Sequence, residues 1–396
     1  MRKTCSLIIV AFAFLLLVSC ASSRELDLSE RQSQVQSVVS FIAKNHPDPY
    51  RASGKKAFQE ATSKLMSSCD AMEEIDYFLA LQSLVSMIRD SHTAINFFSR
   101  VDARFAIRIR EFDGAPILTR CPLDGQGYIG WEVKGIGGLS YADYIKKLGT
   151  LVSWDNEVYL KSNASGYLQM PDVMKHLGLS DGKTLSLELS SGKMTATYLV
   201  QAATEVKLSS LAQMESLTAP TAAKDTSYYL ADLDDKGTLY FQYNVCEDNP
   251  DYPMTAVMKA LKKASPSALI IDLRYNGGGD SRVLQPMIDY VSANPDMRTS
   301  VLVGWDTFSS AILNAKALRK AGARLYGEPT GGSANHYGEI IDMKIAEGVT
   351  LFCSTRTFGD RNAMGTPLMP DVLVSTCLES FKSGQDDVVT AALSNL

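Results

Sequence analysis

The chain has 396 residues, and its 39 Lys and Arg against 44 Asp and Glu give a formal net charge of −5. At roughly 150 residues per domain, this length predicts two or three domains. Hydrophobic residues at 45% and charged residues at 21% are typical of globular proteins, and they exclude a disordered chain, a collagen-like fibre and a coiled coil. No run of five Lys or Arg occurs, so nucleic acid, whose phosphates need clustered cations, is not an expected partner.

The first twenty residues resemble a bacterial lipoprotein signal rather than part of the fold. Two cations precede an apolar run over residues 7–18, which is shorter than the ~20 residues that span a bilayer. The run ends in Leu-Val-Ser-Cys, which resembles a lipobox. We therefore predict a signal peptide over residues 1–19 and a lipid on Cys20, which would anchor the chain in the bacterial cell envelope, on the periplasmic or cell-surface side. The alternative is an ordinary signal peptide with a chance cysteine.

Apolar residues at helical spacing predict three helices in the first hundred residues. The three apolar faces fall within residues 35–42, 58–65 and 78–88. The last of these patterns ends at Arg-Asp-Ser-His. We expect a helical N-terminal region over residues 20–99.

The middle third changes to an apolar residue at every second position. This alternation over residues 105–109 and 185–189 is typical of half-buried strands. A helix is expected over residues 141–148. We predict a small β-rich module over residues 100–207, and a connector rich in Ala, Ser and Thr over residues 209–225.

From Tyr228 onward the pattern alternates between strands and helices, which predicts an α/β domain with crossover connections over residues 226–396. The expected strands cover residues 239–243, 268–273 and 300–303, and the expected helices cover residues 255–263, 281–291 and 310–320.

Two strand-to-helix junctions of this region can carry chemistry. The first contains Asp272-Leu273-Arg274-Tyr275-Asn276-Gly277-Gly278-Gly279, in which the glycines allow backbone N–H groups to approach a substrate closely. The segment has neither the GxxxxGK[ST] nor the GxGxxG pattern of a phosphate loop. The alternative is a tight turn without a functional role.

The second junction contains Thr307-Phe308-Ser309-Ser310-Ala311 at the start of a predicted helix. A serine between a strand and a helix is where a nucleophile would be exposed beside free N–H groups. The alternative is that one of the two serines caps the helix, which is the commoner role of serine at this position.

Together with Gly327-Glu328-Pro329-Thr330-Gly331-Gly332 and Pro370-Asp371-Val372, these segments resemble the S41 peptidase family, which includes the carboxyl-terminal (tail-specific) processing proteases and the tricorn protease core. The resemblance covers the chain from about Leu239 to the C-terminus. It implies a catalytic domain resembling the crotonase and Clp-protease spiral, and the middle module is similar in position and length to the family's PDZ-like domain.

The resemblance also implies roles for individual residues. Ser309 would be the nucleophile, and the N–H groups of Gly278 and Ser310 would form the oxyanion hole. The sequence departs from the processing proteases at the base, because Ser333 stands where their lysine follows Thr-x-Gly. Lys316 lies about 10 Å further along the predicted helix than Ser309, and we expect it to be solvated.

A histidine base is the alternative, as in the tricorn-like members. His92 resembles the Ser-His segment of those members, and a neutral imidazole suits proton transfer at neutral pH. His336, close to the second glycine turn, is the rival base. We expect Glu339 to orient the histidine, with Glu328 as the alternative carboxylate.

The sequence therefore predicts a membrane-tethered serine peptidase that acts on peptides or proteins and needs no metal or organic cofactor. Two alternatives stay open. One is a non-catalytic relative that binds peptides or apolar ligands in the same cleft, and the other is an esterase that uses the same site.

Overall fold

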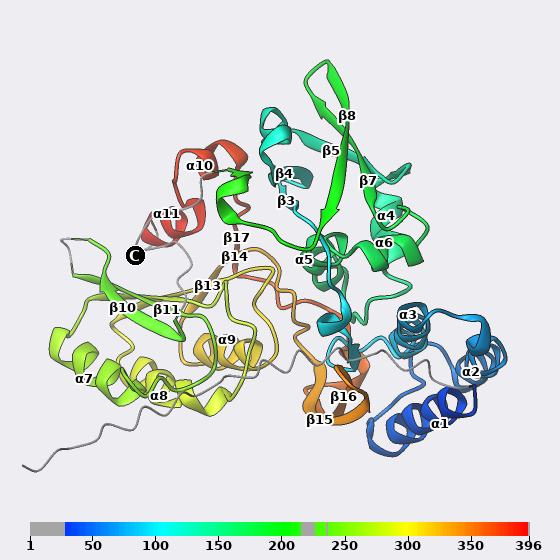
Figure 1. Cartoon of the computed structure of the whole chain (residues 1–396). Coiled ribbons are helices and arrows are strands. Elements are labelled where there is room, and N and C mark those ends of the chain that lie inside the picture. Colours follow the sequence, from blue (N-terminus) through cyan, green and yellow to red (C-terminus); the bar gives the residue numbers. More distant parts are fainter. Residues whose placement is uncertain (1–27, 215–225, 235–236, 395–396) are drawn as a thin grey trace, which may run out of the picture.

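The computed structural model describes residues 28–214, 226–234 and 237–394, which form N-terminal helices, a mixed middle module and a C-terminal α/β part (Figure 1). The predicted signal peptide, Cys20 and most of the predicted connector lie outside these residues. Within the described ranges, no helix is both long and apolar enough to cross a membrane.

The N-terminal region contains the three predicted helices, α1 (Leu28–Asn45), α2 (Lys55–Ser68) and α3 (Glu74–Ser86). It is not wholly helical to residue 99, because the short strand β1 (Ala94–Asn96) pairs with β16 (Val349–Phe358) near the other end of the chain. Three residues are too few to show a periodic pattern, so this strand could not be predicted from the sequence.

The middle module is an eight-stranded sheet with three helices. Its strands lie in the order β2-β8-β7-β5-β4-β3, while β6 pairs with β5 and β9 pairs with β4. Because β9 belongs to this sheet, the module extends beyond the predicted end at residue 207. Helix α4 was predicted with its observed bounds, whereas α5 was not predicted. The bounds are β2 (Arg104–Phe105), β3 (Arg108–Phe112), β4 (Ala115–Pro122), β5 (Glu132–Ile136), β6 (Leu139–Ser140), α4 (Tyr141–Leu148), α5 (Glu157–Leu168), α6 (Pro171–His176), β7 (Thr184–Ser191), β8 (Met194–Ala203) and β9 (Leu211–Gln213).

The C-terminal part is built on a six-stranded sheet of order β10-β11-β12-β13-β14-β17. All neighbours from β11 to β17 are parallel, and β10 is an antiparallel edge strand. The alternation of buried residues sends side chains such as Leu269 and Ile271 to one face, against α7, α8 and α9, and Ile270 to the other face, against α11. The bounds are β10 (Tyr228–Asp232), β11 (Thr238–Tyr243), α7 (Met254–Ala264), β12 (Ala268–Asp272), α8 (Gln285–Ala293), β13 (Arg298–Val303), α9 (Ser310–Lys320), β14 (Arg324–Gly327), β17 (Val372–Leu373), α10 (Leu378–Lys382) and α11 (Asp387–Ser394).

Predicted helix 281–291 is divided in the structure. A short 3₁₀ segment (Ser281–Leu284) precedes α8, and Pro286 lies in the first turn of α8. Proline has no backbone N–H to donate, so the first turn of a helix is the position that tolerates it best.

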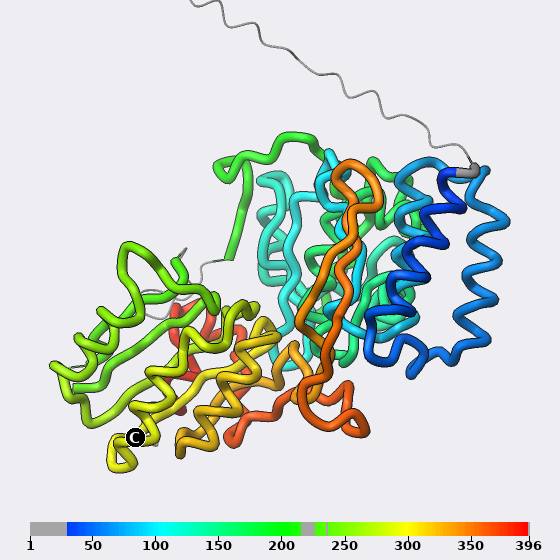
Figure 2. Tube along the Cα trace, turned by 90° about the horizontal axis from the view of Figure 1, so that it is seen from below, coloured from blue at the N-terminus to red at the C-terminus, as the bar shows by residue number. Residues whose placement is uncertain are grey.

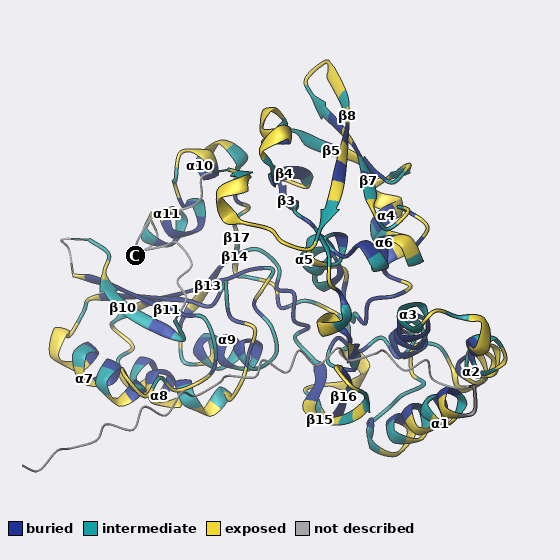
Figure 3. Ribbon diagram, viewed as in Figure 1, coloured by how far each residue is buried: buried dark blue, intermediate teal, exposed yellow. Residues whose placement is uncertain are grey.

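A hairpin connects the C-terminal part to the N-terminal helices. Strands β15 (His336–Ala346) and β16 are antiparallel, and buried residues of β16 belong to the same apolar core as α1, α3 and the middle module. In Figure 2 this hairpin runs alongside the N-terminal helices, and the burial of its core-facing residues is shown in Figure 3. The hairpin thus brings the loop after α3 toward the loops of the C-terminal sheet.

Candidate active site

Three loops leave the carboxyl ends of β12, β13 and β14, which are adjacent parallel strands. Carboxyl ends of parallel strands meet at one edge of a sheet, where ligands of α/β proteins commonly bind. The first loop holds the three glycines, the second holds Ser309, and the third holds the second glycine turn. The two predicted junctions therefore lie together.

Gly278 packs directly against Ser309. A Cβ atom added to Gly278 would lie 2.7 Å from Cβ of Ser309, and the backbone of Gly278 has φ of 106°. Both the space and the dihedral angle exclude a side chain at this position. Glycine is therefore required here for the close approach of the two loops, so the segment is more than a tight turn.

The buried side chain of Asn276 fixes both loops. Its Nδ2 donates to the carbonyl of Tyr243 over 2.9 Å, and its Oδ1 accepts the N–H of Gly278 over 2.8 Å. The Asn276 carbonyl accepts the N–H of Phe308 over 2.9 Å, which ties the glycine loop to the residue before Ser309. This role of Asn276 was not predicted from the sequence.

Ser309 does not use its hydroxyl to cap α9. Its backbone has φ of 53° and ψ of −123°, and no side-chain capping bond forms at this position. A non-glycine residue held at positive φ costs about 1–3 kcal/mol, and such strain is concentrated at functional sites. Ser310 instead donates its hydroxyl to the Gly279 carbonyl over 2.5 Å. The capping alternative is thus not what the structure shows for Ser309.

The two predicted oxyanion donors lie side by side. The backbone nitrogen of Ser310 is 3.1 Å from the position that a Cβ on Gly278 would occupy. As the first residue of α9, Ser310 has an N–H without an intrahelical acceptor. The Gly278 N–H, in contrast, already donates to Asn276, so an oxyanion would have to share this donor.

His92 reaches this site from the N-terminal region. Its ring stacks on Phe308, the residue before Ser309, with ring centroids 4.4 Å apart. Both ring nitrogens are buried without a hydrogen-bond partner, although buried polar atoms are normally paired. Burial lowers the pKa of His92 to about 4, against an opposing effect of the Asp90 charge. The ring is therefore neutral at pH 7, and no hydrogen bond joins it to Ser309 in the described structure.

Asp90 is the buried carboxylate nearest His92. It accepts the His92 backbone N–H over 3.0 Å, and its Oδ1 is 3.9 Å from His92 Nδ1. Its Oδ2 accepts the hydroxyls of Thr93 (2.5 Å) and Ser354 (2.6 Å). His46 Nδ1 accepts the Asp48 N–H, so the His46 proton lies on Nε2, which donates to Asp90 over 3.2 Å.

These contacts decide the charge of Asp90. Burial alone would raise its pKa, but the hydrogen bonds from His46 and Ser354 and the neighbouring imidazoles hold the pKa well below its usual range. Asp90 is therefore ionised, and it fixes the loop that carries His92. This role of the aspartate in the Asp-Ser-His segment was not predicted from the sequence.

His336 stacks on His92 with ring centroids 5.4 Å apart. Its Nδ1 is 2.9 Å from the Ser333 carbonyl, which can only accept, so Nδ1 carries the proton and Nε2 is the basic atom. Burial lowers the pKa of His336 as well. Both candidate bases therefore lie at one site. The ring of His92 contacts Phe308, the residue before Ser309.

The two candidate orienting glutamates lie elsewhere. Glu339 has a side chain that is 60% exposed and pairs with Arg356 over 3.1 Å. Among the described residues, no hydrogen bond or ion pair joins Glu339 to His92. Glu328 lines a separate cavity beside the middle module.

Ser333 and Lys316, the residues weighed for a lysine dyad, form hydrogen bonds to residues other than Ser309. Ser333 is buried and accepts a hydrogen bond from Asn156 over 2.9 Å. Lys316, expected to be solvated, instead donates its ammonium to the Ala334 carbonyl over 2.8 Å and is partly buried. The long side chain reaches the third loop, which the helical rise alone did not indicate.

Comparison with known proteins supports the fold. No family model and no curated protein sequence matches this chain. Mature CPAF matches with a TM-score of 0.62 at 12% identity, over 93% of this chain and 98% of that chain. CPAF complexed with lactacystin matches with a TM-score of 0.60 at 10% identity, over the same shares. The photosystem II D1 C-terminal processing protease matches with a TM-score of 0.43 at 13% identity, over 87% of this chain and 93% of that chain. This similarity is too low to support a common fold. The chain therefore shares the fold of mature CPAF over nearly its whole length.

Proposed function

We propose that this protein is a serine peptidase in which Ser309 is the nucleophile and His92 the general base. The proposal rests on one observation: three features lie together at one edge of the sheet. These are a serine at positive φ whose hydroxyl caps no helix, a glycine loop packed against it, and a buried imidazole with two unpaired nitrogens.

The proposed reaction uses groups that the site brings together. Ser309 Oγ attacks the carbonyl carbon while His92 accepts its proton, and the N–H groups of Ser310 and Gly278 stabilise the oxyanion. His92 then returns the proton to the leaving amine. Water hydrolyses the acyl-enzyme by the same transfers, and no metal or organic cofactor takes part.

We assign the role of positioning His92 to Asp90 rather than to Glu339. Asp90 holds the backbone of His92, and its charge favours the imidazolium that forms during proton transfer. Glu339 is exposed and pairs with Arg356, so a role in orienting His92 would require that the β15–β16 hairpin rearranges.

A fluorophosphonate tests the nucleophile. It should form one adduct, located on Ser309 by tandem mass spectrometry, because a serine hydroxyl without a base beside it does not react at neutral pH. Ser309→Ala should abolish both labelling and peptide turnover, whereas Ser310→Ala should still be labelled. Matched ester and amide substrates then distinguish an esterase from a peptidase. An adduct on Ser310 or Ser333 would move the nucleophile.

A binding protein is the second candidate. The absence of a hydrogen bond between Ser309 and His92 favours it, although catalytic hydrogen bonds are often long before substrate binds. A folded wild-type protein that forms no adduct, yet retains peptides in equilibrium dialysis, would establish this alternative.

We further propose that a lipid on Cys20 anchors the protein in the bacterial cell envelope. The support is the lipobox-like sequence, which lies outside the described residues. Cys20→Ala should leave the precursor uncleaved, with residues 1–19 retained, whereas the wild-type protein should begin at Cys20 and carry lipid mass on it. Wild-type protein without lipid mass on Cys20, or cleavage of the variant at the same position, would contradict the anchor.

A further inference from the structure

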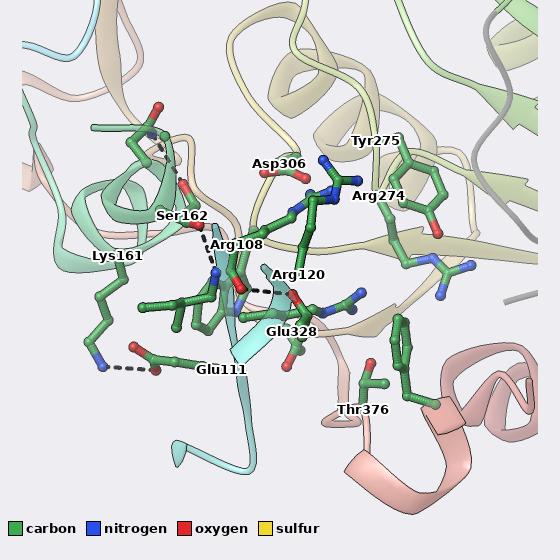
Figure 4. A pocket seen from close by; sticks show the side chains of 18 of the residues that line it. Arg108, Glu111, Arg120, Lys161, Ser162, Arg274, Tyr275, Asp306, Glu328 and Thr376 are labelled. Carbon is green, nitrogen blue, oxygen red and sulfur yellow. Dashed lines mark hydrogen bonds and ion pairs between the residues drawn. The ribbon is translucent and has the colours of Figure 1, made fainter. Parts of the chain in front are cut away.

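A cavity of about 620 Å³ lies between the middle module and the loops of the C-terminal sheet. Its walls include strands β3 and β4, helix α5 and the beginnings of the three loops that form the candidate active site. Figure 4 shows Arg108, Arg120, Asp306 and Glu328 gathered in this cavity, with Lys161 and Glu111 on one side and Arg274 and Tyr275 on the other. A volume of this size is typical of a ligand site.

Some of the charges that line the cavity are neutralised within the protein. Lys161 pairs with Glu111 over 3.3 Å. Arg274 pairs with Asp272 over 2.7 Å and with Asp386 over 2.8 Å, and neither aspartate lines the cavity. These groups are structural, so they leave little charge for a ligand.

Three guanidiniums remain without an ion pair or a hydrogen bond to any described residue. They belong to Arg108, Arg110 and Arg120. Nε of Arg120 is buried without a partner, and Arg110 lies over Phe381 with 4.8 Å between its guanidinium carbon and the ring centroid. Burial lowers the pKa of Arg110. Buried polar atoms are normally paired, so Nε of Arg120 lacks a partner in this cavity, while the half-buried Arg110 and the exposed Arg108 are accessible to the same ligand.

The remaining charges indicate the kind of partner. Among the remaining side chains that line the cavity, three guanidiniums face two carboxylates, Asp306 and Glu328, which is an excess of one positive charge. Asp272 and Asp386, whose two charges exceed that of Arg274 by one, lie outside the lining. A single carboxylate balances the excess within the lining, and it fits the planar fork of a guanidinium. A polyphosphate has several negative charges, which the two carboxylates would repel, so a polyphosphate is disfavoured as the ligand.

The cavity and the candidate active site share the same loops. Tyr275 precedes Gly278 by three residues, and Asp306 precedes Ser309 by three residues. Three residues of backbone span at most about 11 Å. An extended peptide advances about 3.3 Å per residue, so a polypeptide at Ser309 can place a side chain in the cavity a few residues from the bond that is cut.

We propose that this cavity, which we call the arginine pocket, is a specificity subsite that binds an Asp or Glu side chain of the polypeptide substrate. This inference rests on the proposed peptidase function. Arg120 and Arg110 would hold the carboxylate, while Asp306 and Glu328 would limit the site to one negative charge.

A pair of peptides tests the pocket. Cleavage of a mixed library of peptides with amidated C-termini should be enriched in Asp or Glu at one fixed distance from the cut. A Glu peptide from this set should then be cleaved with kcat/KM at least about tenfold above its Gln counterpart, mostly through KM, because the contact is remote from the reacting bond. Arg120→Gln should remove this difference. Arg298→Gln is the matched control, since Arg298 is exposed at the opposite end of β13.

Binding to the Ser309→Ala protein separates the two proposals. Anisotropy of labelled peptides should show the same preference for Glu over Gln, and the preference should be lost on the Arg120→Gln background. Arg110→Gln, at the second arginine proposed to hold the carboxylate, repeats the test if the Arg120 variant does not fold. Cleavage or binding without an acidic preference, or a preference that needs a free C-terminal carboxylate, would overturn the pocket and leave the peptidase intact. Acidic preference in binding without any cleavage or fluorophosphonate adduct would support the pocket and overturn the peptidase.

Discussion

The two halves of the candidate active site are built in different ways. The serine half consists of loops that follow adjacent strands. Hydrogen bonds from the Phe308 N–H to the Asn276 carbonyl and from the Ser310 hydroxyl to the Gly279 carbonyl hold these loops together. The histidine half comes from the end of α3, and it is held through Asp90 by Thr93 and by Ser354 of the distant β16. The serine half is thus fixed by local geometry, and the histidine half depends on long-range contacts.

This difference predicts how each half responds to change. A substitution in the serine half alters the position of the nucleophile or the oxyanion donors directly. A substitution around Asp90 acts through the packing of the hairpin on the N-terminal helices, so it should lower stability as well as activity. The following predictions test this division.

His92→Ala should have the largest effect on activity. Loss of a general base lowers kcat by about 10²- to 10⁴-fold with little change in KM, because its contribution belongs to the transition state. His336→Ala is the matched control, since its ring contacts His92 but its protonated nitrogen is committed to Ser333, and we expect its kcat within a few-fold of wild type. Steady-state kinetics on one peptide substrate measures both, and the reverse ranking would make His336 the base.

Gly278→Ala should lower turnover by at least about 10²-fold. The new Cβ would lie 2.7 Å from Cβ of Ser309, and alanine at φ of 106° adds about 1–3 kcal/mol of backbone strain. Gly277→Ala is the control, because no atom lies within 4 Å of its added Cβ. Turnover and thermal unfolding of the two variants should therefore differ. Equal behaviour would show that the close approach of the two loops is not needed.

Asp90→Asn should destabilise the protein by about 3 kcal/mol. An amide nitrogen would face donors that now bind a carboxylate, and breaking a buried charge network typically costs 3–5 kcal/mol. Glu339→Gln should change stability by less than about 1 kcal/mol, because exposed ion pairs contribute little. Chemical denaturation compares the two, and activity should follow the same order. A larger loss of activity for Glu339→Gln would restore the glutamate as the orienting group.

The sequence predicted the serine half better than the histidine half, for a physical reason. Gly278 and Ser309 belong to strand–loop–helix segments, in which local patterns determine the backbone. The contact of His92 with Phe308 depends instead on the pairing of β1 with β16, whose residues are far apart in the chain. Glu339 was expected to orient the histidine because a base needs a third group that fixes its tautomer, and that argument could not indicate the positive φ of Glu339 or its exposed side chain.

Local sequence patterns also predicted some secondary-structure elements and missed others. The strands β12 and β13 were predicted because their side chains are almost all buried, which leaves a continuous apolar pattern. Helix α5 was not predicted, since its apolar residues do not follow one clear face. The arginine pocket was not anticipated either, because it combines Arg108 and Arg120 with Asp306 across two separate sheets.

The pH dependence of labelling at Ser309 tests the pairing of the two halves most directly. Burial lowers the pKa of His92 to about 4, so the neutral base persists as the pH falls from 7.5 to 5.5 and is lost only near pH 4. The rate of fluorophosphonate labelling, measured on protein shown by circular dichroism to remain folded, should therefore stay constant to about pH 5 and then fall. A decline centred near pH 6.5, the value of an unperturbed histidine, or a rate unchanged by His92→Ala, would contradict the account.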